Sequence, residues 1–276
     1  MSTTSKSPNL LIEVCIDSVE SALAAVRGGA DRLELCGNLN IGGGITPSLG
    51  LFIAVQKAVP RIPIMVMIRP RTGDFLYSEY EIEVMIEDIL TFKKQGAQGV
   101  VFGVLDEAGK VDVAQTQRLV TQALPLEVCF HRAFDMTVSS TEAWSNVCDI
   151  KGITRILTSG HGKTATCADA LEELRLLIQT SSSSEGRTPI KLCPGSGINA
   201  STLPVLCKAL LPYRLDEIHL SGGEWAESAM RWRPQDMGMG TGGNGDWGIW
   251  RTSEEAIRAV RTVADTIYTN LGSAQG

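Results

Sequence analysis

Two short apolar stretches near the start of the chain each end in a carboxylate followed, two residues on, by a thiol. The first carries Glu13 and Cys15 in the run LLIEVC, and the second carries Glu34 and Cys36 in the run DRLELC. Residues two apart on a β-strand share a face, so each carboxylate points the same way as its thiol. Thiolates are soft ligands for a metal ion, whereas small buried cysteines also simply fill a core. Both interpretations stay open from these residues alone.

A second group of reactive side chains follows two later apolar stretches. Arg69 and Arg71 come at and beyond the end of IPIMVMI, and His131 and Asp135 follow LEVCF. Arginine holds a carboxylate or phosphate with two parallel N–H donors. An unperturbed imidazole titrates near pH ~6.5, which suits it to general acid or base catalysis. We therefore predict Glu34, Arg69, His131 and Asp135 as catalytic residues, and Arg71 as an anion ligand.

The same alternation of faces brings further polar and sulfur-bearing side chains to the inner side of the predicted strands. They are Glu127, Cys129, Lys191, Cys193 and His219. Charges inside a fold are costly unless they are paired. The alternative to a functional site is thus a structural ion-pair network, above all for the deeper Glu13, Glu127 and Lys191. Packing alone does not require charge at the strand ends, so the alternative explains Arg69, His131 and Asp135 less well.

Two glycine-rich turns follow the last two predicted strands. CPGSGIN contains Gly195 and Gly197, and HLSGGEW contains Gly222 and Gly223. Bare backbone N–H groups in such turns can reach an anion, and the loops after strands seven and eight commonly bind phosphate in (β/α)8 barrels. We predict these four glycines as anion-binding. The alternative is that they only permit tight turns.

The elements that must position these residues form a repeated strand–helix pattern. Eight units and a length close to the ~250 residues typical of a (β/α)8 barrel predict a single-domain α/β TIM barrel over 10–272. A doubly wound open sheet would usually need fewer units. In such a barrel the functional groups gather where the strands end. The expected strands are 10–16, 32–36, 62–68, 99–104, 126–130, 155–158, 190–194 and 217–220, and the expected helices are 18–27, one opening at Thr46–Pro47, 79–95, 113–123, 140–149, 166–180, 201–211 and one capped by Thr252.

Two segments lie outside this pattern. Residues 1–9 are polar and are predicted to be a disordered tail. Residues 222–252 are rich in glycine and contain four tryptophans. A connection of that length is usually a functional lid or a disordered insert.

Composition narrows the classes of function. The chain has 276 residues, of which 43% are hydrophobic, and a net charge of −6, which argues against nucleic acid or an anionic membrane as partner. No apolar run approaches the ~20 residues of a membrane span, and the first residues lack the apolar core of a signal peptide. We expect a cytoplasmic or nuclear protein with reduced thiols. Seven cysteines without a CxxC pair do not suggest disulfides or a zinc finger.

Several motifs together resemble the copper homeostasis protein CutC family, over roughly residues 10 to 235. They are EVCIDS, GGADRLELC, GGGITPS, VMIRPRTGDFLYS, FHRAFDM and LTSG. The resemblance implies a TIM barrel, a cytoplasmic or nuclear copper-binding protein, and in some members an oligomer. It also implies a Cu(I) site formed by the cysteines that match the family pair, here Cys15 and Cys36. The chain departs from the family at GSGI and HLSGG, both within the predicted anion turns.

Two hypotheses of different class follow. In the first, the protein binds Cu(I) through Cys15 and Cys36. In the second, it is a TIM-barrel enzyme acting on a small anionic metabolite, a class that includes phosphorylated compounds, because a copper carrier does not need Glu34, Arg69 and His131 gathered at the strand ends. Copper binding and a bound metabolite are not mutually exclusive.

Overall fold

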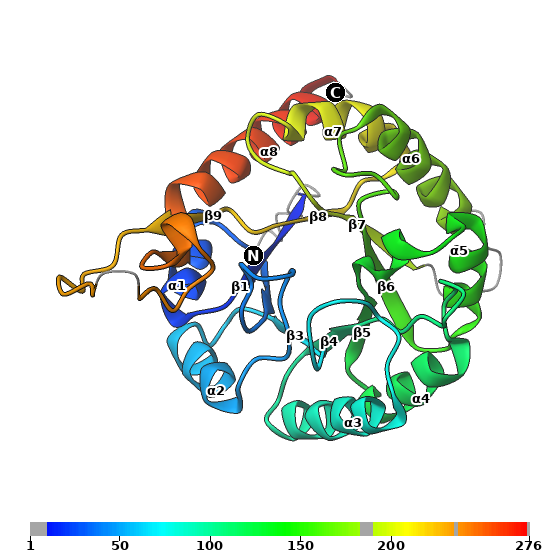
Figure 1. Cartoon of the computed structure of the whole chain (residues 1–276). Coiled ribbons are helices and arrows are strands. Elements are labelled where there is room, and N and C mark those ends of the chain that lie inside the picture. The colour runs from blue at the N-terminus through cyan, green and yellow to red at the C-terminus, as the bar shows by residue number, and fades with distance from the viewer. Residues whose placement is uncertain (1–9, 183–189, 235–236, 275–276) are drawn as a thin grey trace, which may run out of the picture.

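The structure is a computed structural model that describes residues 10–182, 190–234 and 237–274. The predicted disordered tail at 1–9 lies outside the described residues. Figure 1 shows a ring of helices around a central barrel of strands, viewed along the barrel axis.

The described strands and helices alternate around this ring, so the predicted (β/α)8 barrel is confirmed. Eight parallel strands form one sheet in the order β7-β6-β5-β4-β3-β2-β1-β8, and a bridge between Gly195 and His219 connects its two ends. The strands are β1 Leu11–Ile16, β2 Arg32–Leu35, β3 Ile64–Met67, β4 Gly99–Phe102, β5 Glu127–Phe130, β6 Ile153–Thr158, β7 Lys191–Pro194 and β8 Glu217–Leu220. The α-helices are α1 Val19–Gly28, α2 Leu49–Ala58, α3 Glu79–Lys94, α4 Val113–Ala123, α5 Ser140–Asp149, α6 Ala168–Ser182, α7 Leu203–Leu210 and α8 Glu254–Ala274.

Helices α3, α4 and α5 begin at the predicted residues, whereas α1, α2 and α8 begin one or two residues later because a serine hydroxyl takes the capping position. Ser18 caps α1 by accepting from the N–H of Ser21, and Asp17 before it accepts from the N–H of Leu39. Thr252 is the last residue of a strand and does not cap α8, which begins one residue after Ser253. A short hydroxyl side chain satisfies a free N–H of the first turn in each case.

The lower interior of the barrel holds a chain of ion pairs that runs from buried residues to the exposed Glu127. Arg32 pairs with Glu13 and, at 2.8 Å, with Glu217. Arg155 lies 2.8 Å from the other oxygen of Glu217 and 2.9 Å from Glu127. Glu13 and Glu127 therefore belong to a structural network, as the alternative reading proposed. Lys191, expected beside them, is exposed.

The segment 222–252, expected to be a lid or a disordered insert, begins and ends as an ordered hairpin. Strands β9 Gly223–Ala226 and β10 Ile249–Thr252 pair antiparallel, and the rings of Trp225 and Trp250 meet edge to face at 5.4 Å. In Figure 1 this orange hairpin lies beside α1 and projects from the barrel. The hairpin thus brings Trp250 to the end of the barrel where the strands finish.

Candidate functional site

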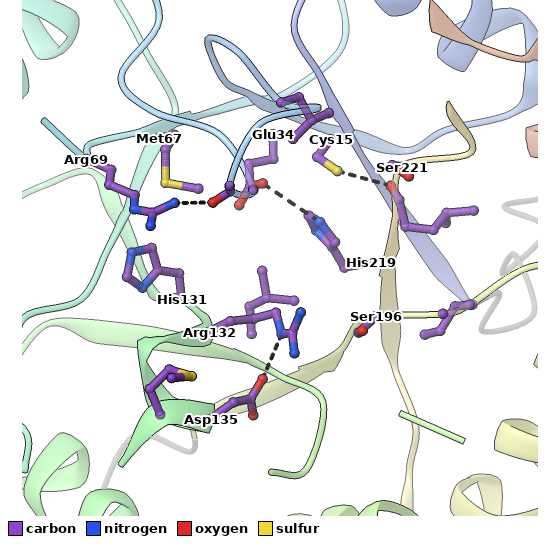
Figure 2. Close-up of a pocket in the computed structure, with 18 of the residues that line it drawn as sticks. Cys15, Glu34, Met67, Arg69, His131, Arg132, Asp135, Ser196, His219 and Ser221 are labelled. Carbon is purple, nitrogen blue, oxygen red and sulfur yellow. Dashed lines mark hydrogen bonds and ion pairs between the residues drawn. The ribbon is translucent and has the colours of Figure 1, made fainter. Parts of the chain in front are cut away.

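A cavity of about 500 Å³ opens where the barrel strands end. Its lining includes seven polar side chains from five different strands or the loops that follow them, and Figure 2 shows them converging. They are Cys15, Glu34, Arg69, His131, Arg132, Asp135 and His219. All four residues predicted as catalytic and one of the two predicted metal ligands therefore line one cavity.

Three of these residues form a cluster able to hold a metal ion. One ligand atom each from Cys15, Glu34 and His219 lies within 4.8 Å of the other two. The Nε2 atom of His219 is 3.8 Å from Oε2 of Glu34. All three residues are less than 10% exposed. A thiol, a carboxylate and an imidazole are all established metal ligands, so this arrangement fits a bound cation.

The strand register explains why Cys15 faces Glu34. In the β1–β2 pair, Cys15 is opposite Glu34 and Glu13 is opposite Arg32. The two Glu-x-Cys motifs are therefore staggered by two residues instead of level. A level register would bring closest the thiols of Cys15 and Cys36, for which the resemblance implies a Cu(I) site, but barrel closure requires staggered strands.

Cys36 lies next to the cluster without belonging to it. Its Sγ is 3.6 Å from Oε2 of Glu34, and the residue is fully buried and does not line the cavity. A Cβ at Gly44, where φ is +93°, would lie 2.8 Å from Cβ of Cys36, so the 42–44 loop closes over this thiol. Burial, and then the nearby Glu34 carboxylate, raise the pKa of Cys36 well above its usual range. Both effects keep Cys36 protonated.

His219 was placed on the inner face by its sequence position, but it was not predicted as a site residue. Its Nδ1 lies 2.8 Å from Oε1 of Glu13, which leaves Nε2 for the cluster. Burial alone would lower the pKa of His219, but the Cys15 and Glu34 side chains raise it well above its usual value. The pKa of Cys15 is raised by burial. Without a metal ion, the proton of His219 provides the positive charge that the carboxylates need.

Arg69, predicted to neutralise a substrate anion, instead holds two loops together. Its Nη1 donates to the carbonyl oxygens of Gly42 at 2.5 Å and Gly44 at 3.0 Å, and its Nη2 donates to that of Gly73 at 2.9 Å. The guanidinium also lies 4.9 Å from the centre of the Phe75 ring. These contacts indicate that Arg69 positions the loops around the cavity.

His131 lines the cavity but does not titrate near neutrality, as an unperturbed imidazole would. Burial, and then the positive charge of Arg69, lower its pKa to about 3. Its Nδ1 accepts the N–H of Ala133 at 3.2 Å, which puts the single proton of the neutral ring on Nε2. His131 is therefore a neutral residue of the cavity lining, held by the backbone and packed against Phe75 at 4.8 Å.

Both carboxylate oxygens of Asp135 accept hydrogen bonds from neighbouring groups. It accepts from the hydroxyl of Thr158, from the N–H and hydroxyl of Ser159, and from Nε of Arg132 at 2.7 Å. A carboxylate bonded in this way has little capacity to move protons. Its geometry suits the orientation of Arg132, which directs its guanidinium into the cavity in Figure 2.

Of the predicted anion-binding residues, the cavity lining contains Gly197. Arg71 lies away from it and pairs with Glu81 at 2.5 Å and Asp74 at 3.0 Å. The other three glycines are close to neighbouring side chains: a Cβ there would lie 2.7 Å or less from an atom of Leu157, Ile257 or Trp250, for Gly195, Gly222 and Gly223 respectively. Close packing thus accounts for these three glycines.

Comparisons with known proteins identify relatives over most of the chain. The profile of the CutC family matches residues 10–223. The copper homeostasis protein cutC homolog of Homo sapiens is 41% identical over 258 residues, which are 93% of this chain and 90% of that one. The family protein CutC of Histophilus somni is 40% identical over 91% of this chain and 97% of its own.

Solved structures support the same fold. A Streptococcus agalactiae protein described as a copper homeostasis protein CutC superposes with a TM-score of 0.69, at 26% identity over 77% of this chain and 98% of its own. A dihydrodipicolinate synthase from Bacillus clausii, 13% identical with a TM-score of 0.52, shares the barrel fold alone. Among the described residues, no helix is long and apolar enough to cross a membrane.

Proposed function

The chain belongs to the CutC family, and on that premise we propose that it acts in copper homeostasis by binding a copper ion through Cys15, Glu34 and His219. The observation that carries this proposal is the meeting of a thiol, a carboxylate and an imidazole at one cavity. The proposal keeps Cys15 from the sequence prediction, and the staggered register together with the three-residue cluster supports Glu34 and His219 in place of Cys36. The proposed place of action is the cytoplasm or nucleus, where thiols stay reduced.

The donor set fits copper. A thiolate is soft and selects Cu(I) or zinc, and an imidazole binds either metal. Glu13, at 2.8 Å from Nδ1 of His219, would hold the ring with Nε2 toward the ion, as carboxylates do behind metal-binding histidines. Three protein ligands leave a position for a further ligand, which is typical of sites that exchange or act on what they bind.

Anaerobic titration with Cu(I) against a competing chelator tests the proposal. Cys15→Ser and His219→Asn should each weaken binding by about tenfold or more, because each removes a ligand of the ion. Cys36→Ser and Cys167→Ser, which alter a buried thiol beside the cluster and an exposed one, should bind as the unchanged protein does. A parallel titration with Zn²⁺ establishes the preferred metal. Equal Cu(I) binding by all four variants would refute the proposal.

A second candidate function is that of an enzyme for a small anionic metabolite. The size of the cavity favours it: about 500 Å³ is far more than one ion needs, and lies in the range of pockets for small organic ligands. Incubating the protein with copper and candidate metabolites, and following their turnover in the unchanged protein and in Cys15→Ser, tests this candidate.

A further inference from the structure

Arg132 lines the cavity with its side chain held in one position by neighbouring residues. The side chain is still partly exposed to solvent. Its Nε is held by Asp135 at 2.7 Å and its Nη2 lies 3.2 Å from the hydroxyl of Ser159. The side chain nevertheless remains 44% exposed. A guanidinium held in one orientation loses less entropy when it binds an anion, because its rotamer is already fixed.

The support behind Arg132 is itself rigid. Asp135 is only 5% exposed in its side chain and is bonded by Thr158 and by Ser159, at the end of β6. Ser159 in turn donates to the carbonyl of Gly162 at 2.6 Å. Both oxygens of the buried Asp135 carboxylate are occupied by these hydrogen bonds. Its role in this network is to orient Arg132.

The loop after β7, which contains Ser196, Gly197 and Ile198, provides backbone N–H donors at the cavity. Ser196 accepts the N–H of Ala165 at 3.0 Å through its carbonyl, and its hydroxyl donates to the carbonyl of Lys163. The following N–H groups, of Gly197 and Ile198, donate to no other described residue, and both residues line the cavity with Arg132. Successive free N–H groups in a left-handed turn favour a negatively charged ligand.

The charges of the cavity are also more positive than those of the chain. The whole protein carries a net charge of −6, yet the cavity lining holds two arginines, Arg69 and Arg132, beside two carboxylates, Glu34 and Asp135. Arg69 donates to backbone carbonyls and not to an acid. The guanidinium of Arg69 therefore has no described carboxylate as hydrogen-bond partner, which favours an anionic ligand in the cavity.

We infer that the cavity binds a small metabolite bearing a phosphate or carboxylate group, and that Arg132, oriented by Asp135, recognises that oxyanion together with the N–H groups of Gly197 and Ile198. The inference gives the second candidate function its recognition residue and ligand class. Neither the binding of the anion nor its test requires the metal ion. The cavity volume fits a small metabolite and not a polymer.

Calorimetric titration of metal-free protein with glycerol 3-phosphate, pyruvate and uncharged glycerol tests the inference. At least one anion should bind more tightly than glycerol. Comparing glycerol 3-phosphate with pyruvate shows whether the site prefers a phosphate or a carboxylate group. Arg132→Met should weaken that binding by about tenfold or more, since a hydrogen bond to a charged group is lost. Arg118→Met is the matched control, because Arg118 is also paired with carboxylates, Glu79 and Glu83, but does not line the cavity.

Binding of neither anion above the level of glycerol, or equal anion binding by Arg132→Met and the unchanged protein, would overturn the inference. Circular dichroism and the melting temperature of both variants establish that they are folded. Copper binding provides an independent readout: Arg132→Met should keep the Cu(I) affinity that Cys15→Ser loses. Failure of the copper proposal and failure of the anion proposal therefore give different results.

Discussion

Oε1 of Glu13 lies 2.8 Å from Nδ1 of His219, on adjacent strands β1 and β8. The contact orients the imidazole with Nε2 toward Cys15 and Glu34. It also links the proposed metal site to the ion pairs below, because Glu13 binds Arg32 through its other oxygen. A single carboxylate thus connects barrel stability with the geometry of the site.

Replacing Glu13 by Gln should weaken copper binding by about 10- to 100-fold, the usual effect of losing the group behind a metal-binding histidine. The neutral amide would leave Arg32 with less compensating charge, so the free energy of unfolding should also fall. Comparing the Cu(I) affinity of folded Glu13→Gln with that of Glu217→Gln separates the two effects, since Glu217 pairs with the same Arg32 but does not contact His219. Equal affinities in the two variants would contradict the role of Glu13.

Copper affinity should decrease as the pH falls. The raised pKa values of Cys15 and His219 mean that both are protonated in the metal-free protein near neutral pH, and a metal ion must displace those protons. Each displaced proton lowers the apparent affinity by about tenfold per pH unit, so two give up to about 100-fold. Competition titrations at about pH 6 and pH 7 measure the slope. An affinity independent of pH would exclude these two ligands.

His131 should make stability depend on pH in a defined interval. Its pKa is about 3 in the folded protein, against 6.5 for an unperturbed imidazole. Above pH 6.5 the ring is neutral in both states and contributes no pH dependence. Between pH 6.5 and about 3 the unfolded chain binds a proton that the folded protein does not. The free energy of unfolding should therefore decrease as the pH decreases, by up to about 1.4 kcal/mol per pH unit.

Urea unfolding between about pH 5 and pH 8 checks this expectation. His131→Asn should show a shallower decline of stability at low pH than the unchanged protein. His161→Asn, which alters a histidine that lies outside the cavity lining, should keep the original slope. Parallel curves for the unchanged protein and His131→Asn would mean that another group causes the decline.

Arg69→Met should destabilise the fold by about 1–3 kcal/mol, because it leaves one buried and two part-buried carbonyl oxygens without their donor. Those oxygens belong to Gly42, Gly44 and Gly73. Arg71→Met is a suitable comparison, since its ion pairs with Asp74 and Glu81 are partly exposed and such pairs contribute little to stability. A loss for Arg69→Met no larger than that for Arg71→Met would show that Arg69 does not hold the loops.

The sequence predicted the barrel and the inward direction of the Glu-x-Cys motifs, because both depend on local alternation along the chain. It could not predict which residue of β2 lies opposite Cys15. That relationship depends on the stagger between strands, which closure of the whole barrel sets. The sequence therefore paired Cys15 with Cys36, where the structure places Glu34.

The hydrogen-bond partners of individual polar side chains also could not be predicted from the sequence. His219 lies on the last barrel strand, and its contact with Glu13 joins residues 206 positions apart. Asp135 and Arg69 were correctly placed at the cavity, but their hydrogen bonds to Ser159 and to the carbonyls of Gly42 and Gly44 favour a positioning role over the predicted catalytic one. Residue type indicates what a side chain can do, while its neighbours decide which of those capacities remain free.

X-ray absorption spectroscopy at the copper edge of anaerobically loaded protein tests the central claim most directly. A site formed by Cys15, Glu34 and His219 should give one sulfur ligand together with nitrogen or oxygen ligands, and the sulfur contribution should disappear in Cys15→Ser but persist in Cys36→Ser. Two sulfur ligands without nitrogen, reduced to one by Cys36→Ser, would contradict the account and place copper between the two thiols.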